Sequence, residues 1–405
     1  MTSAILYSAT ISPAKITGAV PEDAPELEHH LKGKKGFRNP WTSWKDITFW
    51  GALKLIFTGG IPNPDTTQCT IPVRKPQFPT TRETSTLRAT WLGHASFYVE
   101  FPSGFRALFD PVFEPRCSPV SFLGPKRYTP PPVEVEDIPI IDAVIISHNH
   151  YDHLSLPTLT KIKELHPNVQ FFAPLGNKEW FVSCGFHNIT ELDWWESRDV
   201  KLSSTAKPAV AKVGHDLAGD QGQNGIVPDI EATIGCLPCQ HISSRTPFDR
   251  GHTLWGSWSV ESGGKKLWFG GDTGYRGVPS LPPSEDDYGP EHDYPHCPAF
   301  KSIGELRGPF DLGLIPIGAY EPRHFMSPMH ANPYDSVNIF IDTQCKKALG
   351  MHWGTWVLTG EEVMQPPEVL KKAMAWKGLP ETGVFDVCDL GETREFEEEQ
   401  SVAKL

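Results

Sequence analysis

Four side chains that commonly bind metal ions stand close together in the first half of the chain: His148, His150, Asp152 and His153. Imidazole nitrogen and carboxylate oxygen are donors that zinc, iron and manganese accept in proteins. Four such donors, placed at the end of a rigid strand, suit two adjacent divalent ions. The spacing therefore predicts a metal centre rather than a polar surface turn.

The residues on either side of this group indicate the elements that hold it. Residues 143–146 form a short apolar run rich in β-branched side chains, which predicts a buried strand. Residues 155–165 predict a helix, because a serine at the start and an early proline are typical of helix N-termini. The donors thus lie on the connection between a buried strand and a helix.

Single candidate ligands follow three later segments that are also predicted to be strands. Strand ends that are far apart in the sequence can converge on one edge of a sheet. Further strands are expected at residues 169–173 and 312–317, and a hairpin within residues 87–109. The three segments and their ligands are residues 234–239 before His241, residues 266–269 before Asp272, and residues 347–351 before His352.

The strand–HxHxDH–helix unit, with later His, Asp and His at strand ends, resembles the metallo-β-lactamase pattern. That resemblance implies an α/β fold, the αββα sandwich, with two metal ions in its cleft. Between residues 37 and 390 the chain also resembles the N-acylphosphatidylethanolamine-hydrolysing phospholipase D family. The blocks that carry this likeness are WLGHA (91–95), FDP (109–111), GPKR (124–127), LDWWE (192–196), LWGSWS (254–259), GDTGY (271–275), IGAYEPR (317–323) and HWGT (352–355).

The family resemblance implies a ligand set for two Zn²⁺ ions and a reaction. Two adjacent ions can make a nucleophile from water at neutral pH and stabilise charge on phosphoryl oxygens. The expected reaction is hydrolysis of N-acylphosphatidylethanolamine to N-acylethanolamine and phosphatidate. The implied ligands are His148, His150 and His241 for one ion, Asp152, His153 and His352 for the other, and Asp272 as the bridge.

Further residues are expected to act in or beside the site. His330, in the segment PMHANP, matches a family active-site histidine and is expected to transfer a proton or contact substrate. Tyr151 is expected to contact substrate, and Arg245 to face its phosphate. His94 is expected to be a buried, hydrogen-bonded histidine near the site. The side chains expected to act in catalysis are Asp152, Asp272 and His330.

Charge and composition exclude some classes of partner. The net charge is −12 and no dense basic run is present, so nucleic acid is not an expected partner. A phosphate substrate stays compatible with this charge, because metal ions supply local positive charge. A lactonase or another hydrolase of the same fold remains the alternative enzyme. A zinc-containing lipid-binding module without turnover remains the alternative of another class.

The predicted domain organisation has four parts. Residues 1–36 are expected to form a poorly ordered arm, and residues 37–86 an aromatic extension that packs on the core or a membrane. Within that extension, residues 47–61 predict either a packed helix or a segment lying in a bilayer surface. Residues 87–392 are expected to form the catalytic domain, with polar insertions near 203–229 and 278–298, followed by an acidic tail at 393–405.

Several features bear on location and assembly. The eight cysteines and the lack of a secretory signal at the start of the sequence indicate reduced thiols inside the cell. The expected location is the cytoplasm or the surface of a membrane, where phospholipid substrate is found. The last three residues, Ala403-Lys404-Leu405, are similar to a peroxisomal address and give an alternative location. A homodimer is expected from the family resemblance alone.

Overall fold

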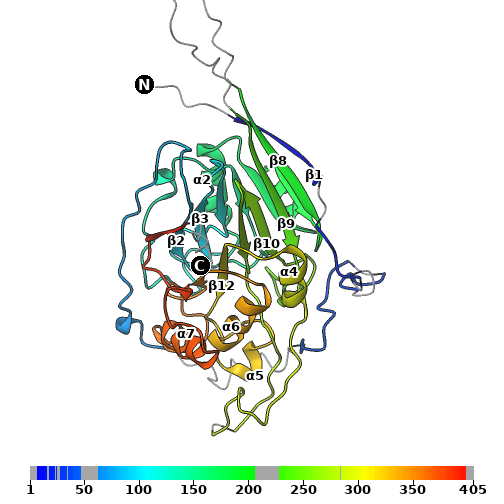
Figure 1. Cartoon of the computed structure of the whole chain (residues 1–405), viewed down its shortest axis with the longest axis vertical. Helices are drawn as coiled ribbons and strands as arrows, with labels where there is room; N and C mark the ends of the chain where they lie inside the picture. Colours follow the sequence, from blue (N-terminus) through cyan, green and yellow to red (C-terminus); the bar gives the residue numbers. More distant parts are fainter. Residues whose placement is uncertain are drawn as a thin grey trace, which may run out of the picture.

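The computed structural model describes residues 7–15, 18–22, 24, 28–33, 35–46, 63–205, 228–282 and 284–397. Over these residues the chain forms two β-sheets, with helices on the outer side of each (Figure 1). This arrangement is the αββα sandwich expected from the sequence.

The larger sheet has eight strands in the described part of the chain, in the order β1-β8-β9-β10-β11-β12-β13-β14. Pairing is antiparallel from β1 to β11 and parallel from β11 to β14. The strands are β1 (Tyr7–Pro13), β8 (Ser197–Ser204), β9 (Ile230–Leu237), β10 (Ser257–Ser262), β11 (Lys265–Phe269), β12 (Leu312–Pro316), β13 (Ala348–Met351) and β14 (Phe385–Asp386).

The smaller sheet has seven strands among the described residues, in the order β15-β2-β3-β4-β5-β6-β7. Pairing is antiparallel from β15 to β4 and parallel from β4 to β7. The strands are β15 (Thr393–Phe396), β2 (Leu87–Gly93), β3 (Ser96–Glu100), β4 (Arg106–Phe109), β5 (Ala143–Ile145), β6 (Gln170–Pro174) and β7 (Ile189–Leu192).

The main core lies between the two sheets. Successive side chains of a strand point to opposite faces, so each central strand is apolar on both sides. In β4, Ala107 and Phe109 belong to the core between the sheets, whereas Leu108 belongs to the layer beneath the outer helices. The ring of Phe109 meets Phe269 of β11 with centroids 4.8 Å apart. The strands that carry the ligands are therefore held rigidly on both faces.

Helices cover the outer face of each sheet. α2 begins after Ser155, whose hydroxyl accepts the amide of Thr158, and buries Leu159 and Ile162 beside α3 against the smaller sheet. α4, α6 and α7 cover the larger sheet. The helices are α2 (Leu156–Leu165), α3 (Lys178–Ser183), α4 (Ala299–Arg307), α5 (Arg323–Met326), α6 (Pro333–Asp342) and α7 (Gln365–Trp376), with short 3-10 turns η1 (Thr66–Gln68) and η2 (Val135–Asp137).

The chain topology sends the ends of several strands to one edge of the sandwich. β4 and β5 run parallel, so the residues after both strands emerge together. In the other sheet β9 and β11 are each antiparallel to β10, and β11 is parallel to β12 and β13. The segments after β9, β11 and β13 consequently emerge at one edge as well. All the strands that were predicted to carry ligands are present, with boundaries shifted by a few residues.

The expectation of a disordered arm over residues 1–36 is wrong for residues 7–13. These residues form β1, which pairs antiparallel with β8 along its whole length (Figure 1). The boundary before an acidic tail at residue 393 is also misplaced, because residues 393–396 form β15 and pair with β2. The ends of the described chain therefore contribute one strand to each sheet.

The polar insertion near residues 278–298 packs against the domain through charged and aromatic side chains. The carboxylate of Asp287 pairs with Arg276 at 3.2 Å and with Arg323 at 2.8 Å. Tyr288 donates a hydrogen bond to buried Asp335, which also binds both arginines. Opposite charges satisfy one another here, so a sequence that looks like a solvated loop packs on α6.

Some predicted features lie outside the described residues. They are most of the first insertion (206–227), the segment at 47–62 and the C-terminal tripeptide. In the part of the chain that is described, no helix is long and apolar enough to cross a bilayer. Of the predicted extension, residues 37–46 pack on the core, where the ring of Trp41 stacks on Trp194.

Candidate metal centre

The structure brings all seven side chains predicted as ligands to one buried site. His148, His150, Asp152 and His153 lie on the turn between β5 and α2. The others follow β9, β11 and β13 of the opposite sheet. They form two groups of donors, His148, His150, His241 and Asp272 in one, and Asp152, His153 and His352 with His94 in the other.

In the first group, three imidazole nitrogens converge beside a carboxylate oxygen. His148 Nε2 lies 2.8 Å from His150 Nδ1, and His241 Nε2 lies 3.4 Å from the same atom. Asp272 Oδ2 is 3.8 Å from His148 Nε2 and 3.7 Å from His241 Nε2. Four donors so close together surround a volume of the size that one metal ion occupies.

The second group shares the same oxygen of Asp272. Asp272 Oδ2 is 3.2 Å from His153 Nε2 and 3.0 Å from His352 Nε2. Asp152 Oδ2 lies 3.4 Å from His153 Nε2 and 3.6 Å from His352 Nε2. Because Asp272 Oδ2 faces donors of both groups, it is placed as a bridge between two ions would be.

Hydrogen bonds behind the donors fix which nitrogen faces the site. His148 Nδ1 lies 2.9 Å from Ser147 Oγ, which in turn donates to Asp110 at 2.5 Å. The same carboxylate accepts from His153 Nδ1 at 2.7 Å. His241 Nδ1 donates to the carbonyl of Met329 at 2.9 Å. Such partners orient metal-binding histidines and raise their affinity.

His94 is buried, as expected, and contacts the second group. Its Nε2 lies 2.9 Å from Asp152 Oδ2, and its ring centroid is 4.0 Å from that of His352. Burial is the largest cause that lowers the pKa of His94, to about 3. A neutral His94 can donate this hydrogen bond and hold Asp152 in position.

The pKa shifts of the predicted ligands indicate that the site favours positive charge near its carboxylates. Burial alone would raise the pKa of Asp272, but His153 and His352 hold it well below its usual value. Burial is the largest single influence on the pKa of His352 and lowers it, yet the carboxylates of Asp272 and Asp152 together outweigh burial and raise that pKa to about 9. In the first group, burial is the largest cause that lowers the pKa of His148 and His241 well below the usual value. Neutral imidazoles on one side and carboxylates that attract positive charge on the other suit divalent ions.

Several buried polar atoms of the site have no hydrogen-bond partner among the described residues. A protein rarely buries such atoms unpaired, because each loses its bonds to water. Here two of the unpaired atoms are histidine nitrogens that face Asp272 Oδ2, where an ion would satisfy them. The unpaired atoms include His153 Nε2, His352 Nε2 and Asp272 Oδ1. The residues present therefore fit a pair of divalent metal ions.

The backbone around the site is unusual where the ligands need it. Gly271, directly before Asp272, has a φ of 59°, and a Cβ there would stand 2.7 Å from the Cβ of Ser147. His352 and Asp110 take positive φ values of 62° and 38°. Non-glycine residues avoid this region, and such strain gathers at functional sites.

The turn between β5 and α2, which carries His148, His150, Asp152 and His153, is called the metal loop below. Tyr151 and Arg245 interact with each other beside it. The Arg245 guanidinium carbon lies 3.9 Å from the centroid of the Tyr151 ring. Arg245 Nη1 donates to the carbonyls of Asn149 and Leu154, at 2.8 and 2.9 Å. Arg245 was expected to face a phosphate, and the structure instead ties one side of its guanidinium to the metal loop. Contact of either residue with substrate stays a prediction.

His330 lies in the wall of the site, as expected, and is not part of either main donor group. Its Nδ1 is 3.9 Å from Asp272 Oδ2 and has no hydrogen-bond partner in the described chain. Its ring centroid is 5.1 Å from that of His241. Burial lowers the pKa of His330 to about 3, so the ring is neutral. A neutral imidazole beside the donors can exchange a hydrogen bond with a bound molecule.

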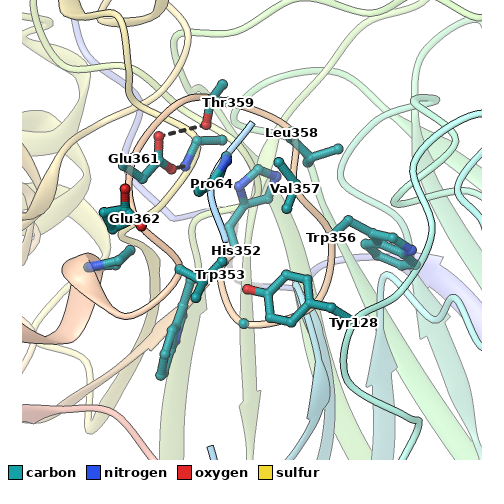
Figure 2. Close-up of a pocket in the computed structure, with 14 residues that line it drawn as sticks. Pro64, Tyr128, His352, Trp353, Trp356, Val357, Leu358, Thr359, Glu361 and Glu362 are labelled. Carbon is teal, nitrogen blue, oxygen red and sulfur yellow. Dashed lines mark hydrogen bonds between the residues drawn. The ribbon is translucent and has the colours of Figure 1, made fainter. Parts of the chain in front are cut away.

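A hollow of about 340 Å³, including its open mouth, adjoins His352. Figure 2 shows His352 in its centre, with Tyr128 and Trp356 on one side and Glu361 on the other. The carboxylate of Glu361 accepts the amides of Ala319 and Glu321 and the hydroxyl of Thr359, so its oxygens are hydrogen-bonded within the protein. The hollow therefore combines polar groups with the apolar side chains of Trp356, Val357 and Leu358 next to the second donor group.

Two positioning residues were not predicted. Asp110 follows β4 directly, as the ligands follow their strands, and this placement was the available signal. Asn39 is buried and donates to the carbonyl of His241 at 2.7 Å. Nearby, Ser43 Oγ donates to Gln240 Oε1 at 2.5 Å. The sequence holds no signal for Asn39, because about 200 residues separate it from its partner.

Comparisons with known proteins show the family of the chain. A family model described as "Beta-lactamase superfamily domain" matches residues 106–353. N-acyl-phosphatidylethanolamine-hydrolyzing phospholipase D 1 of Caenorhabditis elegans is 35% identical over 387 residues, which are 91% of this chain and 94% of that protein. The mitochondrial N-acyl-phosphatidylethanolamine-hydrolyzing phospholipase D of Saccharomyces cerevisiae is 32% identical over 76% of this chain, which spans 56% of the yeast protein.

Among solved structures, Igni18, a metallo hydrolase from Ignicoccus hospitalis, is 20% identical. The match covers 78% of this chain and 100% of that one, with a TM-score of 0.46.

Proposed function

Because this chain is a metal-dependent hydrolase of the β-lactamase superfamily and belongs to the N-acylphosphatidylethanolamine-hydrolysing phospholipase D family, we propose that it hydrolyses N-acylphosphatidylethanolamine. The products are N-acylethanolamine and phosphatidate, and the cofactors are two Zn²⁺ ions. The observation that supports this most strongly is the 35% identity over 91% of the chain, together with donors for two ions around one oxygen of Asp272.

The residues of the chain divide the work between holding ions and holding substrate. Two ions bound by the donor groups supply a nucleophile from water and positive charge for the phosphoryl oxygens. Asp110, Ser147 and His94 keep the donors in orientation through the hydrogen bonds described above. His330 lies beside Asp272, and its Nδ1 has no hydrogen-bond partner in the described chain. This nitrogen accepts a hydrogen bond that a hydroxyl group of the substrate or product donates.

The hollow beside His352 has an apolar part. Trp356, Val357 and Leu358 line it within reach of the second donor group. A glycerophospholipid carries long hydrocarbon chains next to its phosphodiester, so these three side chains beside the metal centre suit it.

The test is product identification with a metal count on the same preparation. Purified protein should contain about two zinc ions per chain and should release N-acylethanolamine and phosphatidate from N-acylphosphatidylethanolamine. Asp272→Asn should lose both bound metal and turnover. Zinc-loaded protein that cleaves a lactone panel but no phosphodiester would favour the alternative hydrolase. Lipid binding without any turnover would favour a binding module.

Location and assembly are part of the proposal as well. The yeast relative is described as mitochondrial. We place the protein at an intracellular membrane surface, where its substrate is found, and expect a homodimer. Fractionation of cells and sedimentation of the pure protein test these two statements separately.

A further inference from the structure

We propose that three exposed apolar points around the metal loop form a docking rim that inserts into the surface of a phospholipid bilayer. The rim consists of residues 118–123, Leu156 at the start of α2, and residues 246–250. This inference rests on the proposed function, because a phospholipid substrate is the reason to expect a bilayer at the metal centre. The rim differs from the segment at residues 47–61 that the sequence offered as a membrane contact.

The exposed side chains of the rim are unusually large and apolar. Phe122 is 80% exposed and Leu123 66% exposed, and Phe248 is 88% exposed. All other phenylalanines in the described part of the chain are buried or half-buried. Scattered exposed aliphatic residues are ordinary, but phenylalanines at the tips of two loops indicate an interaction site.

The first loop is tied to the metal loop at its base. The carboxylate of Glu114 accepts the hydroxyls of Ser155, at 2.5 Å, and Thr158, at 3.0 Å. Cys117 packs with Val112 and Trp356, and Tyr151 of the metal loop packs against this cluster. Residues 119–123 then project from this anchored base with no charged side chain among them.

The second loop is also tied to the metal loop. Arg245 reaches the carbonyls of Asn149 and Leu154 and lies over Tyr151. Asp249 closes the loop by accepting the amides of Arg245 and Thr246. Phe248 is held at the tip of this closed turn. Both tips thus start from residues that contact Tyr151, and Leu156 follows the metal loop directly.

Charge and shape favour a bilayer over a protein as the partner. The chain has a net charge of −12, yet Arg116, Lys126 and Arg250 stand at the bases of the two tips. The acidic residues at these bases, Glu114 and Asp249, accept hydrogen bonds within the protein. Arg116 donates one to the carbonyl of Gly124. Cations behind apolar tips match lipid phosphates above hydrocarbon. Separate tips on different loops suit a fluid surface that closes around each one, whereas protein interfaces bury a continuous patch. A rim around the metal loop would bring the phosphodiester of a membrane lipid to the donors.

Cosedimentation of the full chain with vesicles tests the rim. Vesicles of phosphatidylcholine, with and without one fifth phosphatidylserine, are mixed with the wild type and with the triple variant Phe122→Ser, Leu123→Ser and Phe248→Ser. The expected result is at least a tenfold weaker partition of the variant on both vesicles. Stronger wild-type binding to the anionic vesicles, weakened by salt, is expected from the basic residues.

Matched controls separate the rim from general loss of surface hydrophobicity or folding. Ile341 on α6 and Trp376 on α7 are each 45% exposed on the outer helices, so Ile341→Ser with Trp376→Ser should bind vesicles like the wild type. The triple variant should keep the metal content and melting temperature of the wild type. Hydrolysis of N-acylphosphatidylethanolamine in vesicles should fall in parallel with partition.

Three results would overturn the rim. They are a wild type that ignores both vesicles, a triple variant that binds as well as the wild type, and a control that loses as much as the triple variant. A triple variant that changes only from dimer to monomer would assign the tips to a second copy of the chain and also overturn the proposal. If vesicle binding depends on the rim but no N-acylphosphatidylethanolamine is cleaved, the docking surface stands and the proposed reaction fails.

Discussion

At the scale of single residues, Asp110 supports the site although it is not one of the predicted ligands. Its two oxygens accept the amide and hydroxyl of Ser147 and Nδ1 of His153. It thereby fixes the start of the metal loop and one imidazole of the second donor group. The carboxylate is fully buried, so it has no alternative partner in water.

Asp110→Asn should lower metal affinity by about 10- to 100-fold, because an amide can accept from Ser147 or His153 but cannot match the charge of the carboxylate. The measurement is zinc retained against a series of chelator concentrations. Asp65→Asn is a matched control, since Asp65 is exposed and caps only the turn η1. Equal zinc retention in the two variants would show that Asp110 is not a positioning residue.

The ligands themselves could be predicted from the sequence, and their supports mostly could not. His148 to His153 are dense enough to be noticed, and His241, Asp272 and His352 each follow a recognisable strand. Asp110 lies in one of the blocks that carry the family resemblance and follows a strand, but its type and place do not say which side chains it binds. The tie of Arg245 to the metal loop depends on where a distant turn comes to lie, and no local pattern encodes that position.

At the scale of elements, the N-terminal extension is part of the metal centre. Residues 37–46 lie along the segment after β9, where Asn39 binds the carbonyl of His241 and Ser43 binds Gln240. Gln240 in turn donates to the carbonyl of Pro328, two residues before His330. The extension thus connects one metal ligand to the segment that carries His330.

Asn39→Ala should weaken the hold on His241, because it leaves a buried carbonyl unpaired, at a cost of about 1–3 kcal/mol. We expect faster zinc loss to a chelator and a lower kcat with little change in KM. The control is Asn168→Ala, which removes an exposed side-chain hydrogen bond to the carbonyl of Tyr7 at 3.0 Å and no contact to a predicted ligand. A melting temperature that falls in both variants without any difference in zinc loss would contradict a role at the metal centre.

Elements with strong periodicity were predictable, and those defined by partners were not. The apolar runs at β5, β11 and β13 indicate strands wherever they lie. β1 and β15 lie at sheet edges and bury no residue fully, so pairing with β8 and β2 is what makes them strands. The insertion at residues 278–298 looks solvated until Arg276, Arg323 and Asp335 supply partners for its charges.

At the scale of the whole molecule, the two end segments of the described chain each form an edge strand of one sheet. β1 is the outermost strand of the larger sheet beside β8, and β15 is the outermost strand of the smaller sheet beside β2. Neither strand carries a predicted ligand. An exposed sheet edge is a template for pairing with another chain, so covering β8 protects the molecule from association.

Removal of residues 1–14 should lower the melting temperature and promote association, since it uncovers the edge of β8 while Val200 and Leu202 lose their cover. Light scattering on heating measures association, and calorimetry measures the melting temperature. Zinc content should stay at the wild-type level, because β1 and β8 hold no ligand. A truncated protein that is as stable and monodisperse as the full chain would show that β1 is dispensable.

The order of the donors along the chain has a consequence for biosynthesis. His148, His150, His241 and Asp272 leave the ribosome before the final stretch that carries His352 and the strands β13, β14 and β15. Because chains emerge from the N-terminus and metal sites seldom exist before folding, the second donor group is completed only when nearly all of the chain has been made. A nascent polypeptide stalled before residue 352 holds a complete first donor group and an incomplete second one. The site can therefore be fully loaded with metal only after nearly the whole chain has been synthesised. A truncated product would have at most one complete donor group.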